Sequence, residues 1–398
     1  MNQPRPQVRI DALTGIRILA AAGVFLSHAS APVFLPDRAR TFMAAGYNGV
    51  TLFFILSGFV LALSYADKFN RLDGVTIWNF AVARIARIYP LYLFALLWVM
   101  APGLVTTGFD LTMLRHALAV QAWHPDIAVA YAFNGPGWSI GVEFFLYACF
   151  PLVILALRRI RHSPVLLLTV AGAAFAFTLG LAWWFTATGR ADLPWHDPSS
   201  AHRWLYRMPL TRIGDFVIGA VAALLAMSTR PAAWLGRSAQ IVGAVMMVLL
   251  MQHEPLLFTA WSWDSAYVLP AFLLLWGLAV TPSTGFGRIL GSRPMVVLGE
   301  ASFAFYLLHA ALLPRMHIAE PTGWPSWAAM TAFEFVMIML LAVGAHTVIE
   351  RPAQRWIRRG LSRRSAQPAE LVTPPEAPRA RAPLPAEPPT RSSETAAV

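Results

Sequence analysis

Two ionisable side chains lie in the first apolar stretch of the chain. Arg17 and His28 are eleven positions apart. Eleven residues of helix make three turns plus about 20°, so both side chains would share one face, about 16 Å apart. With Arg17 at the inner membrane boundary, His28 would lie near mid-membrane and could act as a neutral general base. For this pair alone, a snorkelling arginine and a structural histidine hydrogen bond are an equally good account.

A pair of arginines precedes the third apolar stretch, in the sequence Arg84-Ile-Ala-Arg87. At a spacing of three, the two guanidinium groups lie on nearly one face of a helix. Such pairs suit phosphate recognition, because each guanidinium donates several hydrogen bonds in a fixed fork. Considered alone, they are more often a topological anchor at the membrane surface.

Two helical stripes of polar residues occur in other apolar stretches. Trp138 and Ser139, which are candidate substrate-binding residues, open one stretch, and Ser139, Glu143 and Tyr147 recur every four residues. An ionised carboxylate inside a membrane needs a partner or a water-filled cavity, so Glu143 is a candidate catalytic residue.

The second stripe holds Ser302, Tyr306 and His309 at spacings of four and three. Its members either bind a substrate or join helices through hydrogen bonds.

Two further charged features are interpreted as structural. Arg212 and Asp215 are three residues apart, which predicts an ion pair within one helix. Glu350-Arg351-Pro352 follows the last apolar stretch, and there the arginine and the proline are ordinary signals for the end of a spanning helix.

These residues must be positioned by membrane helices. The 398-residue chain is 57% hydrophobic and 13% charged, a balance that a water-soluble globule of this length does not show. About ten apolar runs are long enough to span a bilayer, which predicts an all-α, polytopic helical bundle. The runs are Gly15–Leu35, Gly49–Ala66, Ile85–Ala101, Ser139–Leu157, Pro164–Phe185, Ile213–Met227, Ala239–Met251, Ala266–Val280, Met295–Leu313 and Trp327–Ile349.

The basic residues predict the topology. Although the net charge is +11, arginines lie between the apolar runs rather than in one basic domain, so we expect no nucleic-acid partner. Their excess on alternate segments predicts that both termini are cytoplasmic. We expect an N-terminal segment at 1–12, the bundle at 13–350, a basic juxtamembrane segment at 351–366 and a disordered, Pro- and Ala-rich tail at 367–398.

In order and spacing, these motifs resemble the acyltransferase 3 family. The resemblance covers about residues 8 to 360. It rests on the following pieces: Leu13-Thr-Gly-Ile-Arg17 through His28, Gly49 to Phe59 with its Ser57-Gly58-Phe59, Arg84 to Pro90, Trp138 to Glu143, Ser302 to His309 and Glu350 to Pro352. One departure is Phe144, since many relatives have a second acidic residue there. A role that needs paired carboxylates at this motif is therefore in doubt.

The resemblance implies a plasma-membrane enzyme that transfers an acyl group, usually acetyl, from acyl-coenzyme A to a hydroxyl. The acceptor would be a sugar, a glycolipid or a glycosylated or macrolide-type natural product. His28 would be catalytic and Arg17, Arg84 and Arg87 would handle the donor. We expect His28 to act as a general base, with an acyl-histidine intermediate as the open alternative.

Proteins of other classes share some of these features. A transporter or flippase would also place charges and histidines inside a bundle, although inverted repeats are not evident in the sequence. A metal cofactor is not expected, and hydrolase chemistry lacks support, because there is no His-Glu-x-x-His motif and no Gly-x-Ser-x-Gly elbow. The acceptor, the acyl chain length and the oligomeric state are not specified by the sequence.

Overall fold

The computed structural model describes residues 11–69, 71–107, 109–316 and 321–362, without the side chains of 102–107. Within these ranges the chain is helical and has no strand. Its α-helices are α1 Asp11–His28, α2 Asp37–Ala44, α3 Gly49–Tyr65, α4 Gly74–Thr107, α5 Leu111–Ala117, α6 Ile127–Ala130, α7 Gly137–Arg158, α8 Pro164–Ala187, α9 Ile213–Ser228, α10 Ala233–Met251, α11 Val268–Val280, α12 Gly285–Leu290, α13 Arg293–Met316, α14 Trp324–Ala345 and α15 Arg351–Leu361. The predicted tail at 367–398 lies outside the described residues.

The all-α membrane prediction is confirmed. Seven helical segments among the described residues are long and apolar enough to cross a bilayer, and the shorter apolar helices 213–228 and 265–280 accompany them. A helix lies at each of the ten predicted runs. How many of them span, and on which side the termini lie, stay predictions.

The first helix ends earlier than predicted. The apolar run continues to Leu35, but α1 ends at His28. Pro32 and Pro36 lie in the connection, and a proline restricts the preceding residue to extended backbone. His28 is therefore the last residue of α1, at the point where the chain leaves the helix.

The last span shows the opposite deviation. Helical backbone continues from Trp324 to Leu361, with a π-helical turn at His346–Glu350 between α14 and α15. The prediction that Glu350-Arg351-Pro352 ends the helix is wrong. Pro352 is tolerated because it occupies the first turn of α15, where its missing N–H is not required.

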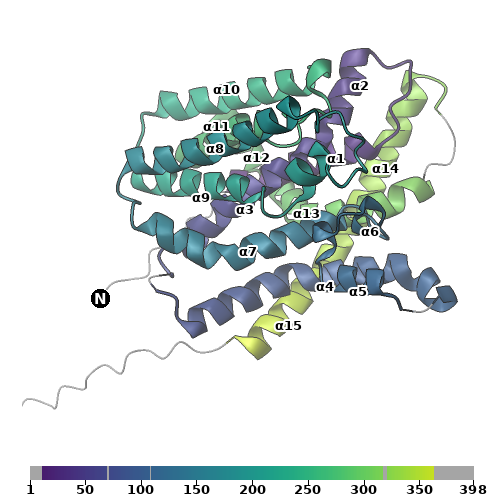
Figure 1. Cartoon of the computed structure of the whole chain (residues 1–398), viewed down its shortest axis with the longest axis horizontal. Coiled ribbons are helices and arrows are strands. Elements are labelled where there is room, and N and C mark those ends of the chain that lie inside the picture. The colour runs from purple at the N-terminus through teal and green to yellow at the C-terminus, as the bar shows by residue number, and fades with distance from the viewer. Residues whose placement is uncertain (1–10, 70, 108, 317–320, 363–398) are drawn as a thin grey trace, which may run out of the picture. The chain divides into compact units, whose positions relative to one another are not determined.

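Close packing of helices positions the motifs. Helix α1 packs along α13, α3 along α9 and α15 along α4 (Figure 1). A Cβ on Gly58 of α3 would lie 2.0 Å from the carbonyl oxygen of Phe216, and one on Gly219 of α9 would lie 1.8 Å from that of Ile55. These glycines let the two backbones touch, as small residues do between membrane helices. The contact holds α3, which carries Ser57, against the rest of the bundle.

Candidate active site

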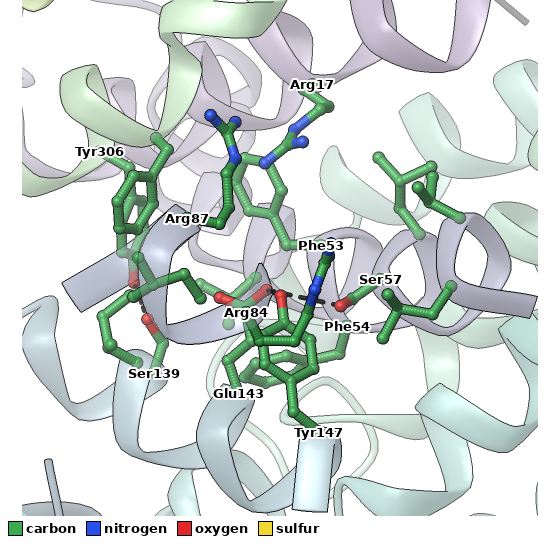
Figure 2. Close-up of a pocket in the computed structure, with 17 residues that line it drawn as sticks. Arg17, Phe53, Phe54, Ser57, Arg84, Arg87, Ser139, Glu143, Tyr147 and Tyr306 are labelled. Atoms are coloured by element: carbon green, nitrogen blue, oxygen red, sulfur yellow. Dashed lines mark hydrogen bonds between the residues drawn. The ribbon is translucent and has the colours of Figure 1, made fainter. Parts of the chain in front are cut away.

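Three of the predicted arginines line one cavity. It has a volume of about 100 Å³ and is formed by α1, α3, α4, α7 and α13; we call it the arginine cavity. Arg17, Arg84, Arg87 and Glu143 line it. The Arg17 and Arg87 guanidinium groups lie near each other, and the hydroxyls of Tyr306 and Ser139 point toward one another at the cavity's edge (Figure 2). Residues far apart in the sequence are therefore gathered as the motifs predict.

The three arginines differ in their partners. Arg87 forms an ion pair with Glu350, which is completely buried and also accepts a hydrogen bond from Nδ1 of His346 at 2.9 Å. Arg84 lies over the ring of Tyr65, 5.6 Å from its centroid, an arrangement that attracts a cation to a ring face. Among the described residues Arg17 has no hydrogen-bond partner, and its Nε is buried. Arg17 and Arg84 thus keep donors available to a ligand.

Glu143 has hydrogen-bond partners and also lines a cavity. Its Oε1 accepts a hydrogen bond from the Tyr147 hydroxyl and a long one, 3.4 Å, from the Ser57 hydroxyl. It also lines the arginine cavity. The predicted stripe of Ser139, Glu143 and Tyr147 therefore faces that cavity along α7.

A second cavity holds His28. It has a volume of about 600 Å³, and we call it the aromatic cavity because rings form most of its wall. These rings belong to Tyr47, Tyr131, Trp138, Trp195, Tyr206, Phe258, Trp263 and Tyr306. No Asp, Glu, Lys or Arg side chain is among the described residues that line it. The cavity therefore suits an uncharged molecule with apolar faces.

The hydrogen bond of His28 determines which nitrogen can act as a base. Nδ1 lies 2.9 Å from the carbonyl oxygen of Val24. Because a carbonyl only accepts, Nδ1 carries the hydrogen and Nε2 keeps its lone pair. The imidazole is thus held in the tautomer that can take a proton at Nε2.

His309 supports His28 from α13. The two rings pack edge to face, with centroids 5.1 Å apart. His309 is completely buried, and its Nδ1 donates to the carbonyl oxygen of Tyr306 at 2.7 Å. Its Nε2 is buried without a hydrogen-bond partner among the described residues. His309 therefore lies behind His28 rather than in the wall of either cavity.

The two cavities meet at Tyr306 and Val50, which line both. The hydroxyls of Tyr306 and Ser139 lie 2.9 Å apart, and Trp138 lines the aromatic cavity while Ser139 lines the arginine cavity. His28 is therefore not sealed off: it opens into a cavity whose wall is shared with that of the arginines. Ser302 lines neither cavity. Its hydroxyl donates to the carbonyl oxygen of Gly299 at 2.8 Å.

Sequence reasoning missed His202, which lies in the π-helical segment His202–Arg207 and lines the aromatic cavity. Its Nδ1 donates to the Trp195 carbonyl oxygen at 3.1 Å, and the Tyr131 hydroxyl lies 3.3 Å from Nε2. Burial, helped by the positive charge of Arg207, lowers the pKa of His202 to about 4. A usable signal was the spacing of four between His202 and Tyr206, which indicates one helical face.

Sequence reasoning also missed the role of Glu350 as partner of Arg87. The ion pair predicted between Arg212 and Asp215 is confirmed, at 3.0 Å, and Arg212 has a second partner, Asp264, at 2.8 Å. All three side chains are buried. Arg212 also donates to the carbonyl oxygens of Tyr206 and Trp263, so this network fixes two segments of the aromatic wall.

Comparison with known proteins identifies the family. The model of the acyltransferase domain (Acyl_transf_3) matches residues 10–351. The chain belongs to this family. It is similar to the acyltransferase MdmB of Streptomyces mycarofaciens, with 32% identity over 386 residues that cover 89% of this chain and 94% of the relative. No solved structure matches.

Other relatives are longer than this chain. The O-acetyltransferase OatA of Staphylococcus aureus (strain NCTC 8325 / PS 47) is 23% identical over 87% of this chain and 57% of its own length. The putative O-acetyltransferase SACOL0978 of Staphylococcus aureus (strain COL) is 21% identical over 77% of this chain and 51% of its own length. The acyltransferase is therefore a multi-pass membrane enzyme, and the relatives favour an enzyme over a transporter.

Proposed function

We propose that this acyltransferase moves an acyl group, usually acetyl, from acyl-coenzyme A to the hydroxyl of an acceptor at the plasma membrane. The donor's phosphates lie at Arg17, Arg84 and Arg87, and the acceptor occupies the aromatic cavity. His28 takes the proton of the attacking hydroxyl. The acceptor class is a sugar, a glycolipid or a glycosylated or macrolide-type natural product. The observation that carries the proposal is that the arginines and His28 line two cavities with a shared wall.

The charges of the arginine cavity support an anionic donor. Three arginines line it, and two carboxylates oppose their charge: Glu143, which lines the cavity, and Glu350, which pairs with Arg87. With both carboxylates ionised, one positive charge is left over, and a phosphate would supply the missing partner. A cavity of about 100 Å³ is too small for a whole coenzyme. The adenosine end therefore stays outside it, and the pantetheine arm enters toward Tyr306.

The tautomer of His28 supports the proposed step. The acceptor oxygen forms a bond to the thioester carbonyl carbon while its proton moves to Nε2 of His28. Breaking the carbon–sulfur bond releases coenzyme A, whose sulfur takes the proton back from Nε2. The Nδ1–H···O bond to Val24 keeps the ring oriented through both steps. Glu143 lies in the other cavity, so its role is to hold the polar groups around the donor through Tyr147 and Ser57.

The proposal is tested by giving the purified protein acetyl-CoA labelled in the acetyl group together with extracted lipids and metabolites. We expect label in an ester product and one free thiol for each ester formed. Coenzyme A should also raise the Tm of the protein, because a ligand that binds only the folded state stabilises it. Label transfer without free thiol, or no stabilisation by coenzyme A at millimolar concentration, would contradict acyl-CoA as the donor.

A further inference from the structure

Tyr306 occupies the position where the two substrates must meet. It lines both cavities, and the other residue that does so, Val50, has no polar side-chain atom. The thioester would arrive from the arginine cavity and the acceptor hydroxyl from the aromatic cavity. Among the residues that line both, only the Tyr306 hydroxyl can donate a hydrogen bond to a reacting group.

The Tyr306 hydroxyl has two hydrogen-bond partners, the Ser139 hydroxyl and the carbonyl oxygen of Pro136. The Ser139 hydroxyl lies 2.9 Å from the carbonyl oxygen of Pro136, which can only accept. With that hydrogen on Ser139 committed, the Tyr306 hydroxyl donates either to the Ser139 oxygen, 2.9 Å away, or to the same Pro136 carbonyl oxygen, 3.3 Å away. Rotation about single C–O bonds would turn the phenolic hydrogen toward a ligand and let Ser139 donate to the phenol oxygen instead.

We propose that Tyr306 is a catalytic residue whose hydroxyl stabilises the oxyanion of the acyl-transfer intermediate. This inference rests on the proposed function. When the acceptor oxygen bonds to the thioester carbon, the carbonyl π electrons move to its oxygen and the acceptor's proton moves to His28. The Tyr306 O–H donates to that oxyanion. Collapse restores the carbonyl, breaks the carbon–sulfur bond and returns the proton to the departing sulfur.

The surroundings of Tyr306 favour this role. The ring packs between Phe53, with centroids 6.0 Å apart, and His309, with centroids 5.7 Å apart. Its side chain is 6% exposed. Donors that are held in place in a site with little water stabilise developing charge without reorganising at the moment of reaction. Ser139 is then a positioning residue, which acts through the phenol.

The first test is the Tyr306→Phe variant, which keeps the ring and removes the donor. We expect kcat to fall by about 10²–10³-fold, the usual effect of losing an oxyanion donor. The KM for acetyl-CoA and the stabilisation by coenzyme A should stay within about twofold. Ser139→Ala should lower kcat by a smaller factor. Tyr267→Phe, a buried tyrosine that lines neither cavity, is the matched control and should keep wild-type kcat.

A second measurement separates an oxyanion donor from a residue that only fills space between the cavities. Fluorotyrosines at position 306 make the phenol more acidic with little change of size. We expect kcat to increase with phenol acidity while the phenol stays protonated. A Tyr306→Phe enzyme with wild-type kcat, or a fluorotyrosine series with constant kcat, would overturn this inference alone. Wild-type protein that cannot use acetyl-CoA would instead overturn the proposed function.

Discussion

Arg87 of α4 and Glu350 of the last span form an ion pair at the edge of the arginine cavity, although 263 positions separate them in the sequence. Glu350 is completely buried, whereas the Arg87 side chain is 21% exposed. A second donor, His346, satisfies the other carboxylate oxygen. The pair joins the end of the bundle to α4, the helix that carries Arg84 and Arg87.

The ion pair predicts that a double variant recovers stability but not activity. Arg87→Met leaves the buried Glu350 without its partner and should cost about 3–5 kcal/mol in stability. Glu350→Leu leaves the partly exposed Arg87 without its partner and should cost less. The double variant should recover much of that loss. It should still transfer acyl groups poorly, because Arg87 is absent. Thermal unfolding of all four proteins in one detergent measures the coupling. Additive losses of Tm would contradict the pairing.

Arg84 offers a more direct test of donor binding, because it contacts ring faces and the Tyr65 hydroxyl, at 3.5 Å, rather than a carboxylate. Arg84→Ala should raise the KM for acetyl-CoA by roughly ten- to a hundredfold with a small change in kcat, the pattern of lost ground-state binding. Arg84→Lys should recover only part of it, since an ammonium lacks the fork. Initial rates over a range of acetyl-CoA concentrations measure both constants. An unchanged KM in Arg84→Ala would remove this arginine from the donor site.

The buried network around Arg212 should determine the shape of the aromatic cavity. Arg212→Met leaves Asp215 and Asp264 facing each other without a cation. The expected cost is about 3–5 kcal/mol in stability. Replacing both aspartates by asparagine in the Arg212→Met background should restore part of the Tm. If Arg212→Met has a wild-type Tm, the network does not hold the fold.

His202 predicts a dependence of stability on pH. Burial holds its pKa at about 4 in the folded enzyme, while an unfolded chain has the usual value of about 6.5. Between these values the unfolded state binds a proton that the folded state does not, so stability falls as pH decreases from 6.5 to 4. His202→Gln should flatten this part of the curve of Tm against pH. The exposed His196→Gln should not. Identical curves for wild type and His202→Gln would contradict a neutral, buried His202.

The long apolar helices and several of the cavity residues could be predicted from the sequence, for physical reasons. Apolar run length located the ten helices, because a membrane span has a minimum length. Ionisable residues inside such runs flagged Arg17, His28 and Glu143, since each is costly without a role. Arg84 and Arg87 followed from a motif. Each of these residues lines a cavity: His28 lines the aromatic cavity, and the other four line the arginine cavity.

The rest depends on contacts that leave no local pattern. Nothing near Glu350 in the sequence announces that Arg87 is its partner, and the end of α1 depended on prolines within an apolar run. The segment between α8 and α9 lies outside the apolar runs, so no run length marks it, yet its Trp195 and His202 complete the aromatic wall. Which of the stripe residues Ser302, Tyr306 and His309 reaches a cavity was also decided by packing.

The most direct measurement is acyl transfer by His28→Ala with its fold verified, beside the exposed-histidine control His253→Ala. We expect kcat of His28→Ala to fall by about 10²–10⁴-fold, the usual contribution of a general base, while the stabilisation by coenzyme A is kept. Added imidazole should restore part of kcat, because the aromatic cavity of about 600 Å³ has room for it. Wild-type kcat in folded His28→Ala would contradict a general-base role for His28.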